Sequence, residues 1–279
     1  MANVVTRFAP SPTGLLHLGH AYSALVAERA ARDAGGRFLL RIEDIDRTRC
    51  RAEFERAIVE DLIWLGVEWD GPVRRQSDHF ADYRAALVKL DAMSLVYPCF
   101  CTRSDIAAAA SAPHGPPVGP EGPIYAGTCR ALDSAQRAAR IAAGAPYALR
   151  LDVNAALART GPLAWRDRDA GQVSVEPALF GDVVLARKDT PTSYHLSVTI
   201  DDHLQGVTLV TRGEDLRAAT HVHRLLQALL GLATPDYRFH TLLTDSSGRR
   251  LAKRDHAQTL QSLRETGHDP AEVRALAGL

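Results

Sequence analysis

The chain has 279 residues, of which 46% are apolar and 24% are charged, and its formal net charge at pH 7 is zero. This composition is typical of a soluble globular protein and argues against a disordered or fibrous chain. No apolar run approaches the roughly 20 residues that span a bilayer, and the N-terminus lacks the basic and apolar pattern of a secretory signal. We therefore expect a cytoplasmic protein with no membrane partner.

Residues 4–20 predict a strand, a turn and the start of a helix. The apolar residues within 4–8 form a short strand, and two prolines and a glycine within 10–14 impose a turn. From His17 onward apolar residues recur at helical spacing, so His17 and His20 fall in the first helical turn.

The first turn of this helix is a candidate phosphate site. A helix start offers backbone N–H groups and a positive dipole end. His17 and His20 share one face and can donate to charge that develops on phosphorus. The alternative is an ordinary helix with two surface histidines, but the strand, the turn and the preceding Arg7 favour a nucleotide site.

Gly35 and Gly36 end the first helix, and residues 37–42 form a buried strand that leads into Glu43. Strand, helix and strand open a parallel α/β sheet, whose ligands bind beyond the carboxyl ends of the strands. Arg7 and Glu43 both occupy such ends. Glu43 is a candidate for binding an ammonium group, and its alternative role is that of a turn carboxylate.

Three clustered cysteines predict a metal site. Cys99 and Cys101 flank one residue, and Cys129 follows after a segment rich in alanine, proline and glycine. A tetrahedral zinc needs a fourth ligand, for which His114 is the usual chemistry and Tyr125 is the other nearby donor. The alternative is three buried free thiols.

The middle of the chain changes character. Residues 145–181 are alternating and turn-rich, which predicts an antiparallel insertion that interrupts the α/β sheet, and residues 183–188 form a strand. The adjacent acids of 201–203 suggest metal binding at first sight. Their side chains point in different directions, however, so we expect a structural role.

The last third of the chain supplies two further candidates. Arg212 ends an apolar strand, where it can meet a ligand carboxylate or form a surface salt bridge. A helix is expected over 220–230. The basic polar turn of 245–255 is either a phosphate clamp or a solvated charged loop.

Taken together, residues 7–20, 41–44, 194–206 and 251–254 resemble class I aminoacyl-tRNA synthetases of the glutamate type over nearly the whole chain. Those enzymes continue into a helical anticodon-binding region after the lysine-arginine loop, whereas only a short segment follows here. The shortness and the cysteine spacing resemble the glutamyl-queuosine tRNA(Asp) synthetase family.

The resemblance implies an α/β fold: a Rossmann-type parallel-sheet nucleotide-binding domain with an inserted zinc-bearing α+β subdomain, a short C-terminal segment and no anticodon-binding domain. The implied segments are the first catalytic half (1–98), the inserted subdomain (99–182), the second catalytic half (183–240), and the lysine-arginine loop with the C-terminal segment (241–279). The implied enzyme is a monomer. It activates L-glutamate with ATP and Mg²⁺ in the absence of tRNA, and transfers glutamate to queuosine in tRNA(Asp).

The resemblance also assigns residues. His17, Gly19, His20 and Lys253 meet ATP, and the two imidazoles and the lysine are the catalytic groups. The implied glutamate ligands are Arg7, Phe8, Ala9, Pro10, Ser11, Glu43, Tyr194 and Arg212. One Zn²⁺ per chain is held by Cys99, Cys101, Tyr125 and Cys129, which selects Tyr125 over His114. Ala252 departs from the serine usual in that family, which we interpret as tuning.

Two other functions fit parts of this pattern. A truncated glutamyl-tRNA synthetase would charge a tRNA 3′ end, but the absence of the anticodon region argues against it. A catalytically silent zinc-bearing RNA-binding relative has no chemical reason to keep His17, His20, Glu43, Arg212 and Lys253.

Overall fold

The computed structural model describes residues 3–111, 116–243 and 258–278. The α-helices are α1 (Leu18–Arg32), α2 (Ala52–Trp64), α3 (Phe80–Ala92), α4 (Arg103–Ala110), α5 (Ser134–Ala142), α6 (Val153–Thr160), α7 (Tyr194–Leu204), α8 (Ala219–Leu230), α9 (Leu260–Glu265) and α10 (Pro270–Leu276). The strands are β1 (Val5–Phe8), β2 (Arg37–Ile42), β3 (Arg74–Arg75), β4 (Val96–Cys99), β5 (Val118–Gly119), β6 (Gly122–Pro123), β7 (Ala148–Leu151), β8 (Ala164–Asp167), β9 (Gly171–Ser174), β10 (Val184–Ala186), β11 (Leu209–Gly213) and β12 (Asp236–His240). None of the helices described is both long and apolar enough to cross a bilayer.

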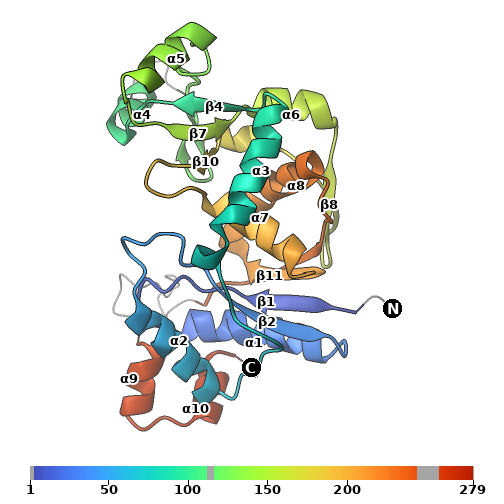
Figure 1. Ribbon diagram of the computed structural model, residues 1–279. Helices are drawn as coiled ribbons and strands as arrows, with labels where there is room; N and C mark the ends of the chain where they lie inside the picture. The colour runs from blue at the N-terminus through green and yellow to red at the C-terminus, as the bar shows by residue number, and fades with distance from the viewer. Residues whose placement is uncertain (1–2, 112–115, 244–257, 279) are drawn as a thin grey trace.

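The molecule is elongated, with three tiers (Figure 1). One end holds β1, β2, α1 and α2, with α9 and α10 packed against them. The middle tier holds α3, α7 and α8 with β11, and the far end carries α4, α5, β4 and β7. Helix α3 runs along the middle tier towards the far end and so joins the two.

Two groups of parallel strands lie side by side at the base of the fold. Strands β1, β2 and β3 pair in parallel, as do β11, β12 and β8. The two groups meet where the Thr208 N–H donates to the Val5 carbonyl at 3.0 Å. The expected parallel α/β architecture is therefore confirmed, and the carboxyl ends of β1, β2 and β11 lie close together.

The far end is built on a separate antiparallel sheet in the order β10–β7–β4, with a small β5–β6 hairpin beside it. Antiparallel pairing therefore occurs within residues 145–181, in β7, but β4 and β10 of this sheet lie outside that range. Strands β8 and β9 also fall within residues 145–181, yet β8 pairs with β12 of the parallel sheet at Asp167 and Tyr237. The division into four segments stays a prediction.

Two apolar clusters support this arrangement. One lies between α3, α7 and α8, and the other lies under β1 and β2 and takes in α1 and α2. Leu260, Leu263 and Val273 belong to the second cluster, so α9 and α10 pack against the base. The Arg274 guanidinium also donates to the Leu65 carbonyl at 2.6 and 3.0 Å, which fixes α10 to the end of α2.

Asp61 is a carboxylate enclosed within this base. Its exposed fraction is 0%, and neither carboxylate oxygen has a hydrogen-bond partner among the described residues. The Arg264 guanidinium on α9 lies 3.6 Å away. Burial raises the pKa of Asp61 from 3.8 to about 6, in spite of the opposing charge of Arg264.

We expect Asp61→Asn to raise the free energy of unfolding by up to about 3 kcal/mol at pH 8 and to change it little at pH 4. When an acid has a higher pKa in the folded state than in the unfolded state, the folded protein loses stability as the pH rises between the two pKa values. Urea denaturation of both proteins at the two pH values measures the difference. A difference that does not grow with pH would contradict this account.

Candidate active site

His17 and His20 form an unusual start to α1. His17 is the N-cap residue: its Nδ1 accepts the Gly19 N–H at 3.1 Å, and its own N–H donates to His20 Nδ1 at 3.2 Å. The two ring centroids lie 3.9 Å apart. Because Nδ1 accepts in both rings, a neutral imidazole carries its proton on Nε2 at each position. The helix start thus presents two imidazole donors of fixed tautomer.

Gly19 packs closely against the His17 ring. A Cβ at that position would lie 3.0 Å from His17 Cε1, so a larger residue would require the imidazole to shift by a few tenths of an ångström. A cavity of about 220 Å³ is lined by all three residues together with Gly213 and Leu243. The predicted ATP residues of the helix start are therefore gathered at one cavity.

Lys253 and its neighbour Ala252 lie outside the described residues, as does His114. The residues on either side of that stretch can be placed. Leu243 lines the same cavity as His17, and Thr259 forms a β-bridge with His17. Leu243 and Thr259, which lie on either side of residues 244–257, are therefore both beside the start of α1.

Arg7 and Arg41 share one carboxylate. Arg7 Nε donates to Asp202 Oδ1 at 2.9 Å, and Arg41 Nη1 donates to the same oxygen at 2.7 Å. Arg41 is fully buried, and Arg7 and Asp202 are 7% and 8% exposed. Although burial alone would raise it, the two guanidinium groups hold the pKa of Asp202 below its usual value. Asp202 on α7 thus fixes side chains of β1 and β2.

Glu43 is held by the same group of charges. Arg41 Nη2 donates to Glu43 Oε1 at 3.1 Å, and the Glu43 N–H donates to the Pro10 carbonyl at 3.0 Å. Burial raises the pKa of Glu43, while Arg41 and Arg7 act in the opposite direction. A further cation, such as a ligand ammonium, would stabilise its ionised form more.

The adjacent acids on α7 point to different partners, as expected from the sequence. Asp201 accepts from Arg74 at 2.8 Å, from Gln76 at 2.8 Å, and from the Tyr83 hydroxyl at 2.9 and 3.1 Å. Asp202 instead accepts from the two arginines described above. Both acids therefore have structural partners.

Tyr194 and Arg212 complete the cluster. Tyr194 is the first residue of α7, and Arg212 lies on β11. Burial raises the pKa of Tyr194, and the charges of Arg212, Glu43 and Arg7 all act on its hydroxyl. The Nε atom of Arg212 is buried and has no hydrogen-bond partner within the described chain. Such an atom is well suited to a ligand carboxylate.

The remaining predicted glutamate residues are Phe8, which ends β1, and the three residues after it. Phe8 is buried in the apolar cluster at the base, which occupies its side chain. Pro10 is buried and Ala9 is half-buried. Ser11 is exposed and lines a cavity of about 230 Å³ together with Glu43 and Tyr194.

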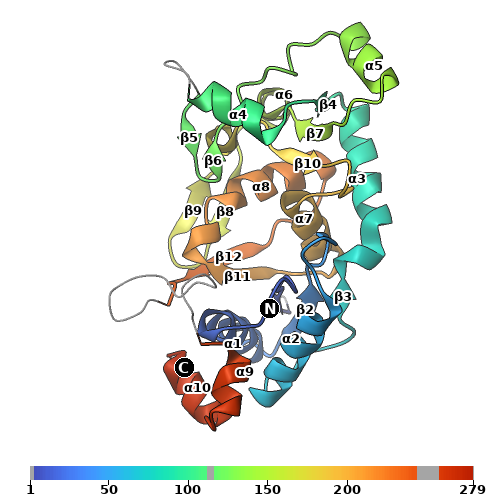
Figure 2. The ribbon, with the colours of Figure 1, turned by 90° about the vertical axis from the view of Figure 1, so that its left-hand side faces the viewer.

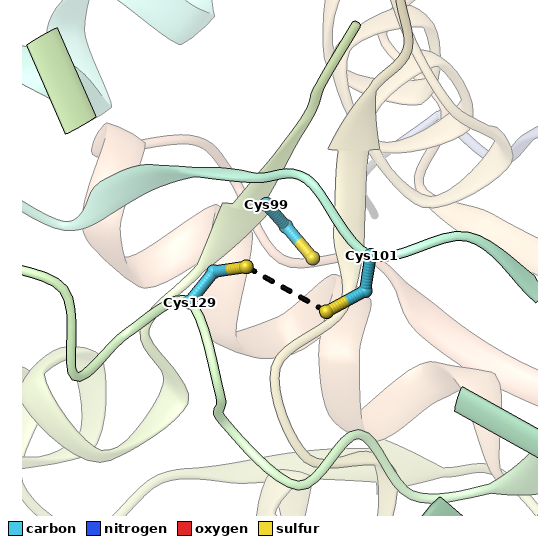
Figure 3. A group of neighbouring side chains, drawn as sticks. All are labelled: Cys99, Cys101 and Cys129. Atoms are coloured by element: carbon cyan, nitrogen blue, oxygen red, sulfur yellow. Dashed lines mark hydrogen bonds between the residues drawn. The ribbon is translucent and has the colours of Figure 1, made fainter. Parts of the chain in front are cut away.

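Three cysteines converge at the edge of the inserted region (Figure 3). The Sγ atoms of Cys99, Cys101 and Cys129 all lie within 4.8 Å of one another, and the Cys101–Cys129 pair is 3.6 Å apart. Tyr125 Oη lies 3.6 Å from Cys101 Sγ and accepts the Cys129 N–H at 2.7 Å. Burial raises the pKa of Cys101 to about 11. The cluster is compatible with a bound metal ion.

Four residues near the site were not predicted as functional: Arg41, Asp202, His195 and His223. Arg41 precedes Glu43 by two positions on β2, and that alternation could have indicated it. The other three are held by contacts between elements far apart in the chain, for which the sequence carries no signal.

Comparisons with known proteins agree with this geometry. The family of tRNA synthetases class I (E and Q), catalytic domain, matches residues 3–277. The Glutamyl-Q tRNA(Asp) synthetase of Rhodobacter capsulatus is 52% identical, with 99% of this chain and 100% of that protein covered. The protein of the same name from Symbiobacterium thermophilum is 44% identical, with 96% and 83% covered.

A solved glutamate-tRNA synthetase from Elizabethkingia anophelis has the same fold, with a TM-score of 0.82 at 26% identity. The likeness covers 99% of this chain and 61% of that chain, so this chain spans about three fifths of its length. From the extent of these matches, the chain belongs to the class I tRNA synthetase family (E and Q), in the group of the Glutamyl-Q tRNA(Asp) synthetases.

Proposed function

We propose that this chain activates L-glutamate with ATP in the absence of tRNA and transfers the glutamyl group to queuosine in the anticodon of tRNA(Asp). The observation that carries the proposal is the convergence of Arg7, Arg212, Glu43 and Tyr194, together with Gly213, the neighbour of Arg212, which lines the His17–His20 cavity. A dicarboxylic amino acid needs two cations and one anion, and these side chains provide them. The relatives named Glutamyl-Q tRNA(Asp) synthetase support the acceptor.

In the first step a glutamate carboxylate oxygen bonds to the α-phosphorus of ATP. The bond from phosphorus to the bridging oxygen breaks, and pyrophosphate leaves. Mg²⁺ bound with ATP would offset the negative charge of the phosphates. Because the attacking group is already an anion, this step needs positioning and charge stabilisation and no general base. His17 and His20 donate through Nε2 to the phosphate oxygens, and Lys253 is assigned to the leaving pyrophosphate.

In the second step a hydroxyl of queuosine attacks the glutamyl carbonyl. The bond from the carbonyl carbon to the phosphate oxygen breaks, and AMP leaves as the hydroxyl proton is taken up by the departing phosphate or by water. The polar cavity that Ser11, Glu43 and Tyr194 line opens beside the expected glutamate position and supports an approach from that side.

We also propose that Cys99, Cys101, Cys129 and Tyr125 hold one Zn²⁺. Zinc–sulfur bonds of about 2.3 Å in a tetrahedron place sulfur atoms about 3.8 Å apart, and the observed Cys101–Cys129 distance is 3.6 Å. Tyr125 Oη is within 3.6 Å of Cys101, so the phenol is the donor beside the three sulfurs. The zinc would brace the start of the inserted region, because Cys99 ends β4.

We expect the purified protein to catalyse glutamate-dependent exchange between ATP and pyrophosphate without tRNA. Aspartate and glutamine in place of glutamate are the controls, because the site pairs two guanidinium groups with a five-carbon dicarboxylate. Absence of exchange with glutamate and Mg²⁺ would overturn the activation step and favour an RNA-binding relative.

The acceptor is tested separately with radiolabelled glutamate, ATP and tRNA(Asp), with or without queuosine. Label that appears only on queuosine-containing tRNA, and that nuclease digestion locates in the anticodon fragment, supports the proposal. Label on the 3′ terminus would instead identify a glutamyl-tRNA synthetase of reduced length.

A further inference from the structure

Beside Arg212 lies a line of hydrogen-bonded side chains that the reaction above does not use. It runs from Glu121, between β5 and β6, through His195 on α7 and His223 on α8, to Arg212 on β11. Figure 2 shows the β5–β6 hairpin close to α8 and α7, with β11 beneath them. This line of hydrogen-bonded side chains therefore connects the inserted region with the strand that carries a candidate glutamate ligand.

The contacts are short and mostly enclosed. Arg212 Nη1 lies 3.3 Å from His223 Nδ1, His223 Nε2 lies 3.2 Å from His195 Nδ1, and His195 Nε2 lies 3.1 Å from the Glu121 carboxylate. His195 and His223 are 5% and 3% exposed, whereas the Glu121 side chain is 56% exposed. Only Glu121, at the outer end of this line of side chains, reaches solvent.

The groups at the two ends of this line, Arg212 and Glu121, determine which nitrogen of each imidazole carries the proton. A guanidinium can only donate, so His223 Nδ1 must accept and its single proton sits on Nε2. That proton is donated to His195 Nδ1, which places the His195 proton on Nε2. From there it is donated to the Glu121 carboxylate, which can only accept. Both imidazoles are therefore neutral and in the same tautomer.

We propose that Glu121, His195 and His223 are positioning residues that fix the Arg212 guanidinium for the glutamate carboxylate, and so make substrate binding depend on the seating of the β5–β6 hairpin. This inference rests on the proposed function, in which Arg212 holds glutamate. Arg212 also donates to Thr220 and lies over the Tyr237 and Phe239 rings, so His223 acts together with those supports.

The surroundings of His223 favour the neutral ring. Burial lowers its pKa well below 6.5, and the positive charges of Arg212, Arg7 and Arg41 act in the same direction. At the other end of the line of side chains, the Glu121 carboxylate is in contact with His195. A cationic His223 would bring an N–H donor against the Arg212 donors, so the acceptor at Nδ1 would be lost.

Steady-state exchange kinetics test the positioning role. We expect His223→Leu to raise the glutamate KM by about 10- to 100-fold while the ATP KM changes less than about twofold, because a hydrogen bond to a charged group is lost. His223→Gln keeps one acceptor and one donor and should restore most of the glutamate affinity. His221→Gln, on the same helix and outside the chain, is the matched control. Equal rises in both KM values, or a Gln variant as impaired as the Leu variant, would overturn the proposal.

Nuclear magnetic resonance of ¹⁵N-histidine-labelled protein tests the chain without any substrate. Spectra of the wild type, His195→Gln and His223→Gln assign the two rings. At pH 7.5 both should be neutral with the proton on Nε2. A cationic His195 or His223 ring, or a proton on Nδ1 of either ring, would contradict the inferred line of hydrogen bonds and with it the proposal. Absence of glutamate-dependent exchange with intact tautomers would instead count against the proposed function alone.

Discussion

Asp202→Asn should lower the free energy of unfolding by about 3–5 kcal/mol. Its carboxylate is the shared acceptor for Arg7 and Arg41, at 2.9 and 2.7 Å, and all three side chains are at least nine-tenths buried. Removing the negative charge leaves two guanidinium groups enclosed, with Glu43 at 3.1 Å and Asp201 at 4.0 Å as the remaining counterions of Arg41. The new amide also presents N–H donors to groups that can only donate.

Urea denaturation at pH 7.5 measures this loss, and Asp169→Asn provides the matched control. Asp169 is paired with Arg238 at 3.4 Å, but its side chain is 60% exposed, so its removal should cost less than about 1 kcal/mol. If the Asp202 variant also lost less than 1 kcal/mol, the buried charge cluster would not be holding α7 against β1 and β2. A variant that folds should still show a raised glutamate KM, because Arg7 is no longer fixed.

Local patterns predicted a large part of the fold. The strands at 4–8 and 37–42 and the helix that starts at His17 agree with β1, β2 and α1, because each has one buried face or a buried apolar run. Helix α7 was not predicted. All residues from His195 to Asp202 are buried, so the helix has no exposed face and no alternation for a sequence pattern to detect.

The residues of the candidate site also fall into those that local sequence patterns predict and those that they do not. Arg7, Glu43 and Arg212 could be predicted because each lies near or just after the carboxyl end of an apolar strand, and these ends of parallel strands converge. The role of Asp202 could not, because its partners Arg7 and Arg41 are 195 and 161 residues away in sequence. His17 as an N-cap also has no sequence signal, since that position usually holds serine, threonine or aspartate.

The purified protein should contain about one zinc per chain, and Cys101→Ser should lose it. Cys101 is the least buried residue of the three and lies 3.6 Å from both Cys129 Sγ and Tyr125 Oη, so it occupies a central position in the proposed ligand set. A serine hydroxyl keeps the size of the side chain but is a far weaker zinc ligand than a thiolate. Metal analysis of protein isolated without added zinc measures the content.

Cys50→Ser is the matched control for that measurement. Cys50 is the remaining cysteine of the chain, lies near Glu43 and Asp46 instead of the cluster, and should leave the zinc content unchanged. Loss of zinc in Cys101→Ser should also lower the melting temperature, since structural zinc contributes directly to folding. Wild-type protein that is isolated without metal, and that melts at the same temperature before and after zinc addition, would contradict the zinc site. The three cysteines would then be free thiols that pack as small apolar side chains.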